Sequence, residues 1–302
     1  MKRTVLWSLL VLFLLACGYW GGYVQLNHNF FISHITLDEW TPANIVPVSS
    51  PEEAATAKKI LDQPFTYLGR GRQSFAFVSQ DGKYVLKFIK AHRVNTSNLY
   101  KSFPLPGFLD TFRNQKLRQS QKDITRLLMS FSLAKDPLQK MTGLIYLHTA
   151  PIQKLQKRVT LIDRIGFTHH VDIDSVPFLL QLKADHVWKT LKTLLKKKDI
   201  PALKNRLSQL VALFVERTNY GIIDPDKQLL KNNNIGFIED RAIYIDLGTF
   251  SESTKSQNPK YLRKNFSTLK PIVHWLQEHD RDLAHYFEQQ MEDAIQAMGR
   301  TL

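Results

Sequence analysis

Apolar residues are spaced differently in three parts of this chain. They form a nearly continuous run over residues 5–24, alternate with polar residues over much of 65–90, and recur every three or four positions from about residue 187 onward. Alternation is typical of half-buried strands, whereas a spacing of three and four is typical of amphipathic helices. The pattern predicts an α+β protein with a strand-rich first part and a helix-rich second part, preceded by an N-terminal hydrophobic segment.

The strand-rich part is preceded by a short predicted helix. Ser50, followed by Pro51 and two acidic residues, is typical of a helix start, and the helix is expected to end near residue 61. An Asp-Gly pair at 81–82 indicates a tight hairpin turn, and a basic helix is expected over 112–133. Strands are predicted at residues 65–68, 74–79, 83–89, 142–147, 159–165 and 176–182.

Helices dominate the second part of the chain. Amphipathic helices are predicted at 187–195 and 203–217, and Gly221 is expected to end the second of them. One more hairpin is expected near residue 240, and the tail over 261–298 carries two further helix patterns. This order of elements suggests two lobes.

The net charge of the chain does not change the predicted fold, but it bears on which partners the protein could bind. The chain of 302 residues has 41 Lys and Arg against 27 Asp and Glu, which gives a formal net charge of +14. A positive surface attracts nucleic acid, anionic lipid, nucleotides or phosphorylated substrates. The basic residues are spread out rather than gathered with aromatic residues, so we interpret them as solvated helix faces and predict no specific nucleic-acid partner.

The N-terminal apolar run has two interpretations. Lys2 and Arg3 followed by such a run are typical of a secretory signal or of a signal anchor that spans a bilayer. The residues around Cys17 resemble a bacterial lipobox, in which the cysteine is acylated after cleavage, whereas Tyr19 and Trp20 fit the interfacial end of an uncleaved helix. Because Cys17 is the only cysteine, an intramolecular disulfide bond is excluded.

A glycine-rich hairpin and a strand lysine form the first candidate site. Gly69, Gly71 and Ser74 lie at the turn between the first two predicted strands, where glycine lets the backbone approach phosphate oxygens closely. A strand rather than a helix follows, which excludes a dinucleotide fingerprint or a Walker A loop. In the third predicted strand Val85 and Lys87 share one face, so we expect the lysine to point toward the glycine hairpin.

Carboxylate and amide side chains form the second candidate site, after the helix predicted at 203–217. Asp224 and Asp226 follow that helix, Asn234 precedes a short predicted strand, and Asp246 ends the next strand within an Asp-Leu-Gly triplet. Oxygen ligands of this kind suit magnesium bound to phosphates. A carboxylate close to an acceptor hydroxyl can act as a general base.

The two candidate sites follow one another in an order that resembles the protein-kinase-like superfamily. The glycine-rich hairpin with its Val-x-Lys strand resembles the N-terminal lobe of protein kinases, and the helix, Asp-bearing loop, Asn, hairpin and Asp-x-Gly resemble their C-terminal lobe. The resemblance is distant, covers roughly residues 65–250, and is closest in style to atypical bacterial sugar or lipid kinases or pseudokinases. It implies a two-lobed fold that binds ATP and Mg.

The resemblance also implies roles for individual residues. Lys87, Asp226 and Asp224 are the candidate catalytic residues, with Asp226 as the base and Asp224 as the alternative. Asn234 and Asp246 are the implied magnesium ligands. The implied nucleotide-binding residues are Gly69, Gly71, Ser74, Val85 and Lys87.

The sequence departs from the family pattern in three respects. The spacing from the candidate base to the asparagine is longer than usual, which leaves the asparagines at 232 and 233 open as alternatives. No glutamate occurs between Glu53 and Glu216, so the helix glutamate that normally pairs with the strand lysine is absent, and Asp123 is the only nearby substitute. Without an Ala-Pro-Glu sequence after the Asp-Leu-Gly triplet, no regulated activation segment is expected.

Two functions follow from the resemblance. The first is a membrane-anchored phosphotransferase that binds ATP and Mg and transfers the γ-phosphoryl group to an unknown acceptor. The second is a weak or inactive pseudokinase that serves as a membrane-tethered binding platform for a protein partner. A third reading, an unrelated basic envelope protein whose motifs match by chance, predicts that the glycine hairpin and Asp246 lie far apart.

The expected organisation has four segments. These are a signal-anchor or lipoprotein signal segment at 1–24, a connector with a short helix at 25–64, an N-lobe at 65–182 and a C-lobe at 183–302. The positive-inside tendency leaves the N-terminus in the cytoplasm and predicts an extracytoplasmic body. This localisation is in tension with the use of ATP.

Overall fold

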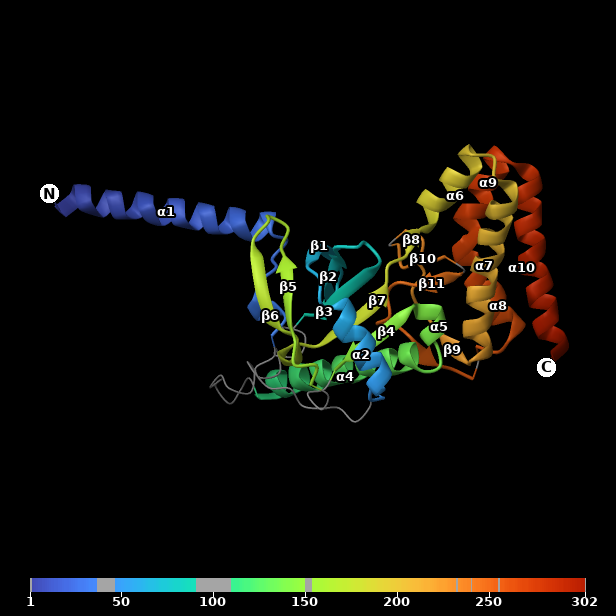
Figure 1. The fold of residues 1–302 in the computed structure, drawn as a ribbon, viewed down its shortest axis with the longest axis horizontal. Helices are drawn as coiled ribbons and strands as arrows, with labels where there is room; N and C mark the ends of the chain where they lie inside the picture. The colour runs from blue at the N-terminus through green and yellow to red at the C-terminus, as the bar shows by residue number, and fades with distance from the viewer. Residues whose placement is uncertain are drawn as a thin grey trace.

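The chain begins with a long helix that stands away from the rest of the molecule. The computed structural model describes residues 2–36, 47–90, 110–149, 154–231, 233–239, 241–254 and 256–301. In Figure 1 helix α1 (Lys2–Leu26) projects from the strand-rich end of the body. Its segment Trp7–Leu26 has the length and composition of a membrane span, with 20 residues at a mean hydropathy of 1.7, a property that signal sequences share.

The strand-rich lobe is built on one large sheet. Within the described part of the chain, seven strands pair in the order β4-β7-β3-β2-β1-β5-β6. Neighbouring strands are antiparallel except β1 and β5, which run parallel. The strands are β1 (Phe65–Arg70), β2 (Ser74–Ser79), β3 (Tyr84–Ile89), β4 (Leu144–His148), β5 (Arg158–Ile162), β6 (Thr168–Asp172) and β7 (Phe178–Leu182).

The turn between β2 and β3 sets the position of the candidate lysine. Gly82 has a φ of 71°, which glycine adopts without a steric penalty, and the Asp81 carboxylate accepts a hydrogen bond from the Lys83 amide at 3.0 Å. The turn fixes a register in which Lys87 on β3 lies opposite Ala76 on β2. As alternation predicts, Lys87 shares its face of β3 with Val85.

Aromatic side chains form the core on the other face of the sheet. Phe75 and Phe77 of β2 are at most 2% exposed, and their rings lie 5.2 and 5.1 Å from the ring of Phe30. Helix α2 (Pro51–Ile60) adds Ala57 and Ile60 to the same core. The segment after α1 therefore packs into the strand-rich lobe.

A second core joins the helices. It contains Leu127 and Phe131 of α4, Phe214 of α7 and Phe287 of α10, together with large-sheet residues such as Leu147 and Leu179, so this core extends into both lobes. Helix α4 itself contacts α5 and β4. Figure 1 shows α7, α9 and α10 packed together at the end of the molecule opposite α1. The helices are α4 (Asp110–Lys135), α5 (Gln139–Thr142), α6 (Val187–Lys196), α7 (Ile200–Asn219), α8 (Pro259–Phe266), α9 (Lys270–His279) and α10 (Arg281–Thr301), with 3-10 turns η1 (Ile32–His34), η3 (Ile173–Ser175) and η4 (Ser267–Leu269).

Short strands connect the large sheet to the helices. β8 follows β7 after two residues and pairs with β10, which pairs with β11 to form the hairpin expected near residue 240. Strands β9 and β12 pair with each other in a separate two-stranded sheet. The chain thus passes directly from the large sheet into the small one that holds the second candidate site. The bounds are β8 (Asp185–His186), β9 (Ile222–Ile223), β10 (Ile235–Phe237), β11 (Ala242–Tyr244) and β12 (Ser251–Glu252).

The α+β class, the strand-rich and helical lobes and the N-terminal apolar helix predicted from the sequence are confirmed, but two details are corrected. The described tail forms α8, α9 and α10 rather than two helices, because Pro271 favours a helix start in the first turn of α9 and Asp280 adopts an extended backbone that ends this helix. The strand predicted from residue 142 begins at Leu144, because Gly143 has a φ of 59° after α5.

Candidate functional site

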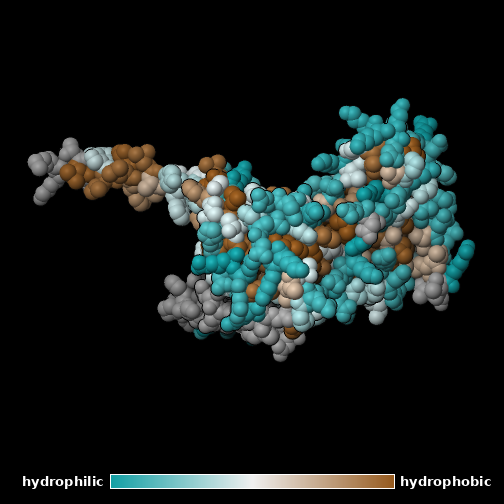
Figure 2. Space-filling view, in the orientation of Figure 1, coloured by the Kyte–Doolittle hydropathy of each residue, from teal (hydrophilic) through white to brown (hydrophobic). Residues whose placement is uncertain are grey.

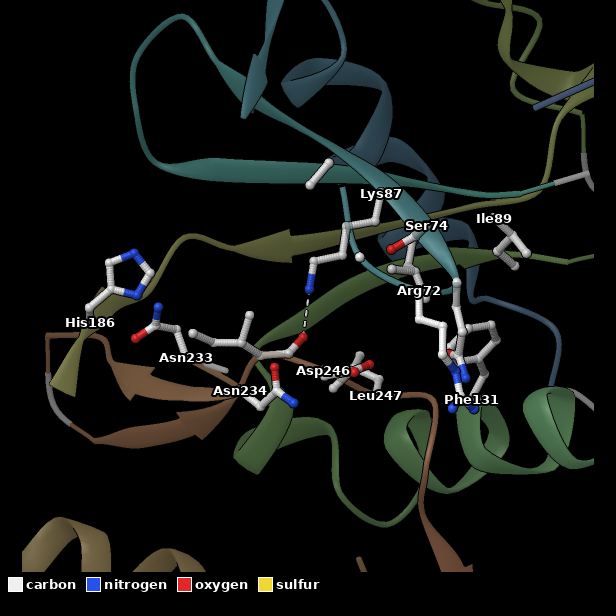
Figure 3. Close-up of a pocket in the computed structure, with 15 residues that line it drawn as sticks. Arg72, Ser74, Lys87, Ile89, Phe131, His186, Asn233, Asn234, Asp246 and Leu247 are labelled. Carbon is white, nitrogen blue, oxygen red and sulfur yellow. Dashed lines mark hydrogen bonds between the residues drawn. The ribbon is translucent and has the colours of Figure 1, made fainter. Parts of the chain in front are cut away.

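The two candidate sites meet in one cleft between the large sheet and the β10–β11 hairpin. A cavity of about 280 Å³ is lined from the sheet side by Gly71, Ser74 and Lys87, and from the hairpin side by Asn234 and Asp246. Figure 3 shows Lys87 pointing down from β3 toward the segment that carries Asp246. The chance-match reading, which required these groups to lie far apart, is therefore wrong.

Lys87 is held by neutral oxygen atoms. Its Nζ donates hydrogen bonds to the backbone oxygen of Ile245 at 2.5 Å and to Oε1 of Gln181 at 2.8 Å. Desolvation in the cleft lowers the pKa of Lys87 from 10.5 to about 8, and the nearby Asp246 carboxylate opposes this shift. A cation with neutral partners keeps its charge available for an anionic ligand.

Gln181 on β7 bonds to Lys87, whereas the sequence lacks the helix glutamate that normally pairs with such a lysine. This β7 side chain is 1% exposed, and its Nε2 donates to the backbone oxygens of Thr142 at 2.5 Å and Tyr244 at 2.9 Å. Its amide is therefore fully used and joins the sheet, the end of α5 and β11. Asp123 as the partner of Lys87 is wrong, because Asp123 pairs with neighbours on its own exposed helix face.

The hairpin side of the cleft supplies oxygen atoms suited to magnesium. Asp246 is exposed, and its Oδ1 accepts a hydrogen bond from the Gly248 amide at 3.2 Å. Asn234 donates through Nδ2 to Oδ2 of Asp226 at 2.7 Å, and in Figure 3 its amide oxygen lies on the cavity side. A carboxylate and an amide oxygen at one cavity wall fit a hard divalent cation. Asn233 also lines the cavity, whereas residue 232 lies outside the described residues.

The two candidate base carboxylates have different environments. Asp226 is partly exposed and is bonded to Asn234, whereas the side chain of Asp224 is only 1% exposed. Oδ1 of Asp224 accepts hydrogen bonds from the Asp226 amide at 3.0 Å and from the Thr249 hydroxyl at 2.9 Å. Asp224 therefore links the loop that carries Asp226 to the segment that follows Asp246.

A buried arginine faces Asp224. Nη1 of Arg217 on α7 lies 3.7 Å from Oδ2 of Asp224, and the arginine side chain is 1% exposed between the rings of Phe214 and Tyr244. Burial raises the pKa of the Asp224 carboxyl, and the Arg217 guanidinium opposes this shift. Among the described residues, Nη1 of Arg217 and Oδ2 of Asp224 have no hydrogen-bond partner. The pair is thus held by charge attraction and packing.

Helix α4 is tied to the segment after Asp246. The Ser130 hydroxyl donates to the backbone oxygen of Leu247 at 2.6 Å and accepts from the Phe250 amide at 2.7 Å. Phe131, the next residue on α4, lines the cavity where a helix glutamate would otherwise face the strand lysine. The helix therefore positions the Asp246 segment through a hydroxyl.

The tip of the glycine-rich hairpin rests on the opposite wall. The Gly71 amide bonds to the backbone oxygen of Ser74 at 2.9 Å, which closes the tip. Nε2 of Gln73 then reaches the backbone oxygen of Gly248 at 3.5 Å. A Cβ atom at Gly248 would overlap the end of the flexible Gln73 side chain, which would have to move away from this position.

Not every nucleotide-binding candidate lines the cavity. Gly71, Ser74 and Lys87 line it, whereas Gly69 and Val85 do not. Gly69 lies at an irregularity in the pairing of β1 with β2. Val85 is 6% exposed and lies opposite Gln181 on β7. The roles assigned to these residues remain predictions.

Sequence reasoning missed four residues of the site, namely Gln73, Ser130, Gln181 and Arg217. Three of them have partners far away in the chain: 94 residues for Gln181 with Lys87, 117 for Ser130 with Leu247 and 175 for Gln73 with Gly248, whereas Arg217 lies seven residues before Asp224. No local spacing marks such contacts. The one available signal was the missing glutamate, which indicated that Lys87 needed a different partner.

Comparison with known proteins gives a structural similarity and no sequence match. No family model matches the sequence, and no curated protein matches it. Two solved structures of WbdD, one described as a bifunctional kinase-methyltransferase, are similar over 73% of this chain, with 15% identity and a TM-score of 0.31 in one and 14% and 0.34 in the other. Both similarities are weak in sequence and in structure. The chain covers 43% and 44% of the WbdD chains, which is less than half their length.

Proposed function

We propose that this protein is a membrane-anchored phosphotransferase of the protein-kinase-like type, which binds ATP with magnesium and transfers the γ-phosphoryl group to an acceptor hydroxyl. One observation carries the proposal: a strand lysine and an Asn–Asp pair of oxygen ligands line the same cavity from opposite lobes. Phosphoryl transfer requires little more from a protein than positioning and charge stabilisation. Both are available in this cleft.

Each residue has a role in this proposal. Lys87 holds the phosphates, with Gly71 and Ser74 of the hairpin above them, and Asn234 and Asp246 hold the magnesium ion. Magnesium, when bound, neutralises negative charge on the phosphates. The acceptor oxygen forms a bond to the γ-phosphorus as the bond to the bridging oxygen breaks and ADP leaves. Asp226 takes the hydroxyl proton.

Asp226 is a better base than Asp224 because of its position. A base must reach the acceptor, and the Asp226 carboxylate is partly exposed next to Asn234. The Asp224 carboxylate is buried against Arg217 and Thr249 and bonds to the Asp226 amide. We assign Asp224 to positioning the loop.

The cavity must widen before a nucleotide binds. Its volume of about 280 Å³ lies just below the range of roughly 300–1,000 Å³ found for ligand sites. The Gln73–Gly248 contact closes one end of it. Separation of the two lobes at this contact is therefore the expected opening movement.

Membrane anchoring rests on α1. The helix is apolar and long enough to span a bilayer, and its Cys17 is exposed. The positive-inside tendency gives an extracytoplasmic body, in which case the outer compartment must supply ATP. The division of the chain into an anchor, a connector, an N-lobe and a C-lobe, with boundaries after residues 24, 64 and 182, is also part of this proposal.

A pseudokinase is the second candidate, because the cleft has a neutral Gln181 where an active kinase normally has a carboxylate beside its lysine. In that case the nucleotide binds but is not turned over. The protein then binds a protein partner instead of a phosphoryl acceptor, and this partner recognises the arrangement in which the two lobes are closed on each other.

Thermal unfolding with and without Mg-ATP tests nucleotide binding. The wild type is expected to gain melting temperature with Mg-ATP, and Asp246→Asn is expected to lose the magnesium-dependent part of that gain. Asp282→Asn, an exposed carboxylate on α10, is the matched control and should behave as the wild type. Unchanged melting of the wild type at saturating Mg-ATP would contradict both candidate functions.

Radiolabelled γ-phosphate separates the two candidates. Wild-type protein in detergent is expected to incorporate label or release phosphate, and Asp226→Ala is expected to reduce this by about 10²- to 10⁴-fold while keeping the Mg-ATP stabilisation. A wild type that is stabilised by Mg-ATP but shows no turnover supports the pseudokinase instead.

A further inference from the structure

The β5–β6 hairpin presents apolar side chains at its tip, next to the end of α1. Ile165 and Phe167 are 38% and 55% exposed, although neither catalysis nor the core uses them. Figure 1 places this tip beside the point where α1 leaves the body. In Figure 2 the outer part of α1 is strongly apolar, paler residues follow where the helix meets the body, and apolar residues appear again on the body at this junction. Exposed apolar groups at such a place require a covering partner.

The tip has a defined shape. Oδ1 of Asp163 accepts hydrogen bonds from the amides of Ile165 at 3.1 Å and Phe167 at 2.8 Å, and Gly166 between them has a φ of 93°. The Asp163 carboxylate is buried and also accepts from Asn27 at 3.0 Å. The two apolar side chains are therefore held outward by the turn.

The tip is also fixed to the end of α1. Nη1 of Arg164 donates a hydrogen bond at 2.6 Å to the backbone oxygen of Leu26, in the last turn of α1. A positive charge at this end of a helix also interacts favourably with the helix dipole. Asn27, which is fully buried, bonds to both Asp163 and the Phe30 oxygen. The end of α1 and the tip of the β5–β6 hairpin are therefore held together by these hydrogen bonds.

Aromatic rings surround this junction. The ring of Tyr23 lies 5.9 Å from Trp20, 5.7 Å from Phe31 and 6.4 Å from Phe167. Trp20 is 60% exposed on the apolar helix. Aromatic residues of this kind gather where a membrane protein crosses from hydrocarbon to headgroups. Phe167 therefore lies at the level of the aromatic belt of α1.

We propose that the hairpin tip, residues 164–167, is a second membrane-contacting element that lies in the headgroup region of the bilayer entered by α1. The proposal rests on the anchoring role of α1 in the proposed function and is independent of nucleotide binding. The occupant is a lipid surface because Phe167 contacts Tyr23 at the end of the apolar helix α1. Two exposed arginines at the same junction, Arg164 and Arg70, donate to the backbone oxygens of Leu26 and His28, and their charges attract anionic headgroups.

Two contacts with the bilayer restrict how the body can turn. A single helix leaves the body free to swivel, whereas a hairpin fixed to its end holds the strand-rich lobe against the membrane surface. The glycine-rich hairpin and the sheet side of the cleft belong to this lobe. The cleft thus keeps a constant orientation relative to the lipid.

Spin labels on the full chain in liposomes of phosphatidylcholine and phosphatidylglycerol test the proposal. Cys17→Ser removes the native thiol, and single labels are placed by Ile165→Cys at the tip, Leu12→Cys within α1 and Arg158→Cys at the far end of β5. The ratio of collisions with oxygen to collisions with a polar nickel complex reports depth. We expect this ratio to be highest at 12, several-fold higher at 165 than at 158, and low at 158.

The label at residue 12 distinguishes a failure of the hairpin contact from a failure of the membrane anchor. A high ratio at 12 with equal low ratios at 165 and 158 overturns the hairpin contact and leaves the anchor intact. A low ratio at 12 overturns the anchor and the hairpin contact together. Shielding of residue 165 from both reagents indicates a protein partner or second copy at the tip and also overturns the lipid contact. The variant Phe167→Cys repeats the test at the second apolar position.

Discussion

The two walls of the cleft use charge in opposite ways. On the sheet wall, Lys87 is a cation held by the neutral oxygens of Gln181 and Ile245. On the hairpin side, outside the residues that line the cavity, the buried charges of Arg217 and Asp224 face one another. Buried ion pairs add little net stability because desolvation offsets their attraction, but removing one partner is costly.

The difference separates groups available to a ligand from groups that hold the structure. The charge of Lys87 is not neutralised within the protein, so its interaction energy is available for phosphate. The charge of Asp224 is countered by Arg217, and its oxygen is used to hold Asp226 and Thr249. Substitutions on the two walls should therefore affect different measurements.

The largest effect is expected on the structural wall. Arg217→Met leaves Asp224 buried without a counter-charge and should lower the free energy of unfolding by about 3–5 kcal/mol in urea denaturation. Arg263→Met, which breaks an exposed pair with Glu292, is the matched control and should cost about 1 kcal/mol or less. The double variant Arg217→Met with Asp224→Leu should recover part of the loss. Equal losses for Arg217 and Arg263 would show that the buried pair is not structural.

On the ligand wall, Lys87→Met should weaken Mg-ATP binding by about 10- to 100-fold, the value of one or two charge-assisted hydrogen bonds. The free energy of unfolding should hardly fall, because the substitution removes a desolvated cation. Lys83→Met, at the exposed turn before β3, is the control and should leave the affinity unchanged. Calorimetric titration measures both. Retained affinity in Lys87→Met would assign the cleft to another ligand.

Gln181 connects the two walls, so its variants should affect both kinds of measurement. Gln181→Met removes the donor to the Thr142 and Tyr244 oxygens and should cost about 1–3 kcal/mol of unfolding free energy. Gln139→Met, an exposed amide, should stay within about 0.5 kcal/mol of the wild type. Gln181→Glu should raise the pKa of Lys87, as measured by nitrogen NMR of the lysine side chain. A pKa that does not move would mean that the two groups do not interact.

The smallest effect is a pH dependence of nucleotide affinity. Lys87 binds phosphate only when protonated, and its pKa is lowered to about 8, so affinity should be full below pH 8 and fall as the pH rises through this value. The decrease should be no steeper than about tenfold per pH unit. Lys87→Arg stays charged and should give a flat profile over the same range. A flat wild-type profile would mean that Lys87 is not the phosphate-binding group.

Local patterns in the sequence were sufficient for most elements and for part of the site. The alternation over β2 and β3 and the Asp81–Gly82 turn predicted the face of β3 that carries Lys87, and the resemblance to the protein-kinase-like superfamily implied that Lys87 and Asp246 face one cleft. The partner of Lys87 was not predictable, because Gln181 is an ordinary strand residue until β7 pairs with β3. The choice between Asp224 and Asp226 was open for a related reason, since burial is a property of the packed loop.

The sequence by itself determined the order of elements, the apolar helix at the N-terminus and the residue types able to hold a phosphate and a divalent cation. These depend on periodicity and on turn chemistry, which act over a few neighbouring residues. Only the tertiary structure decided that an amide faces Lys87, that Arg217 holds Asp224, and that a hairpin tip lies beside the end of α1. The first and last of these contacts join residues 94 and 136 positions apart, and the second depends on the burial of Arg217 and Asp224, so each exists only once the chain has packed.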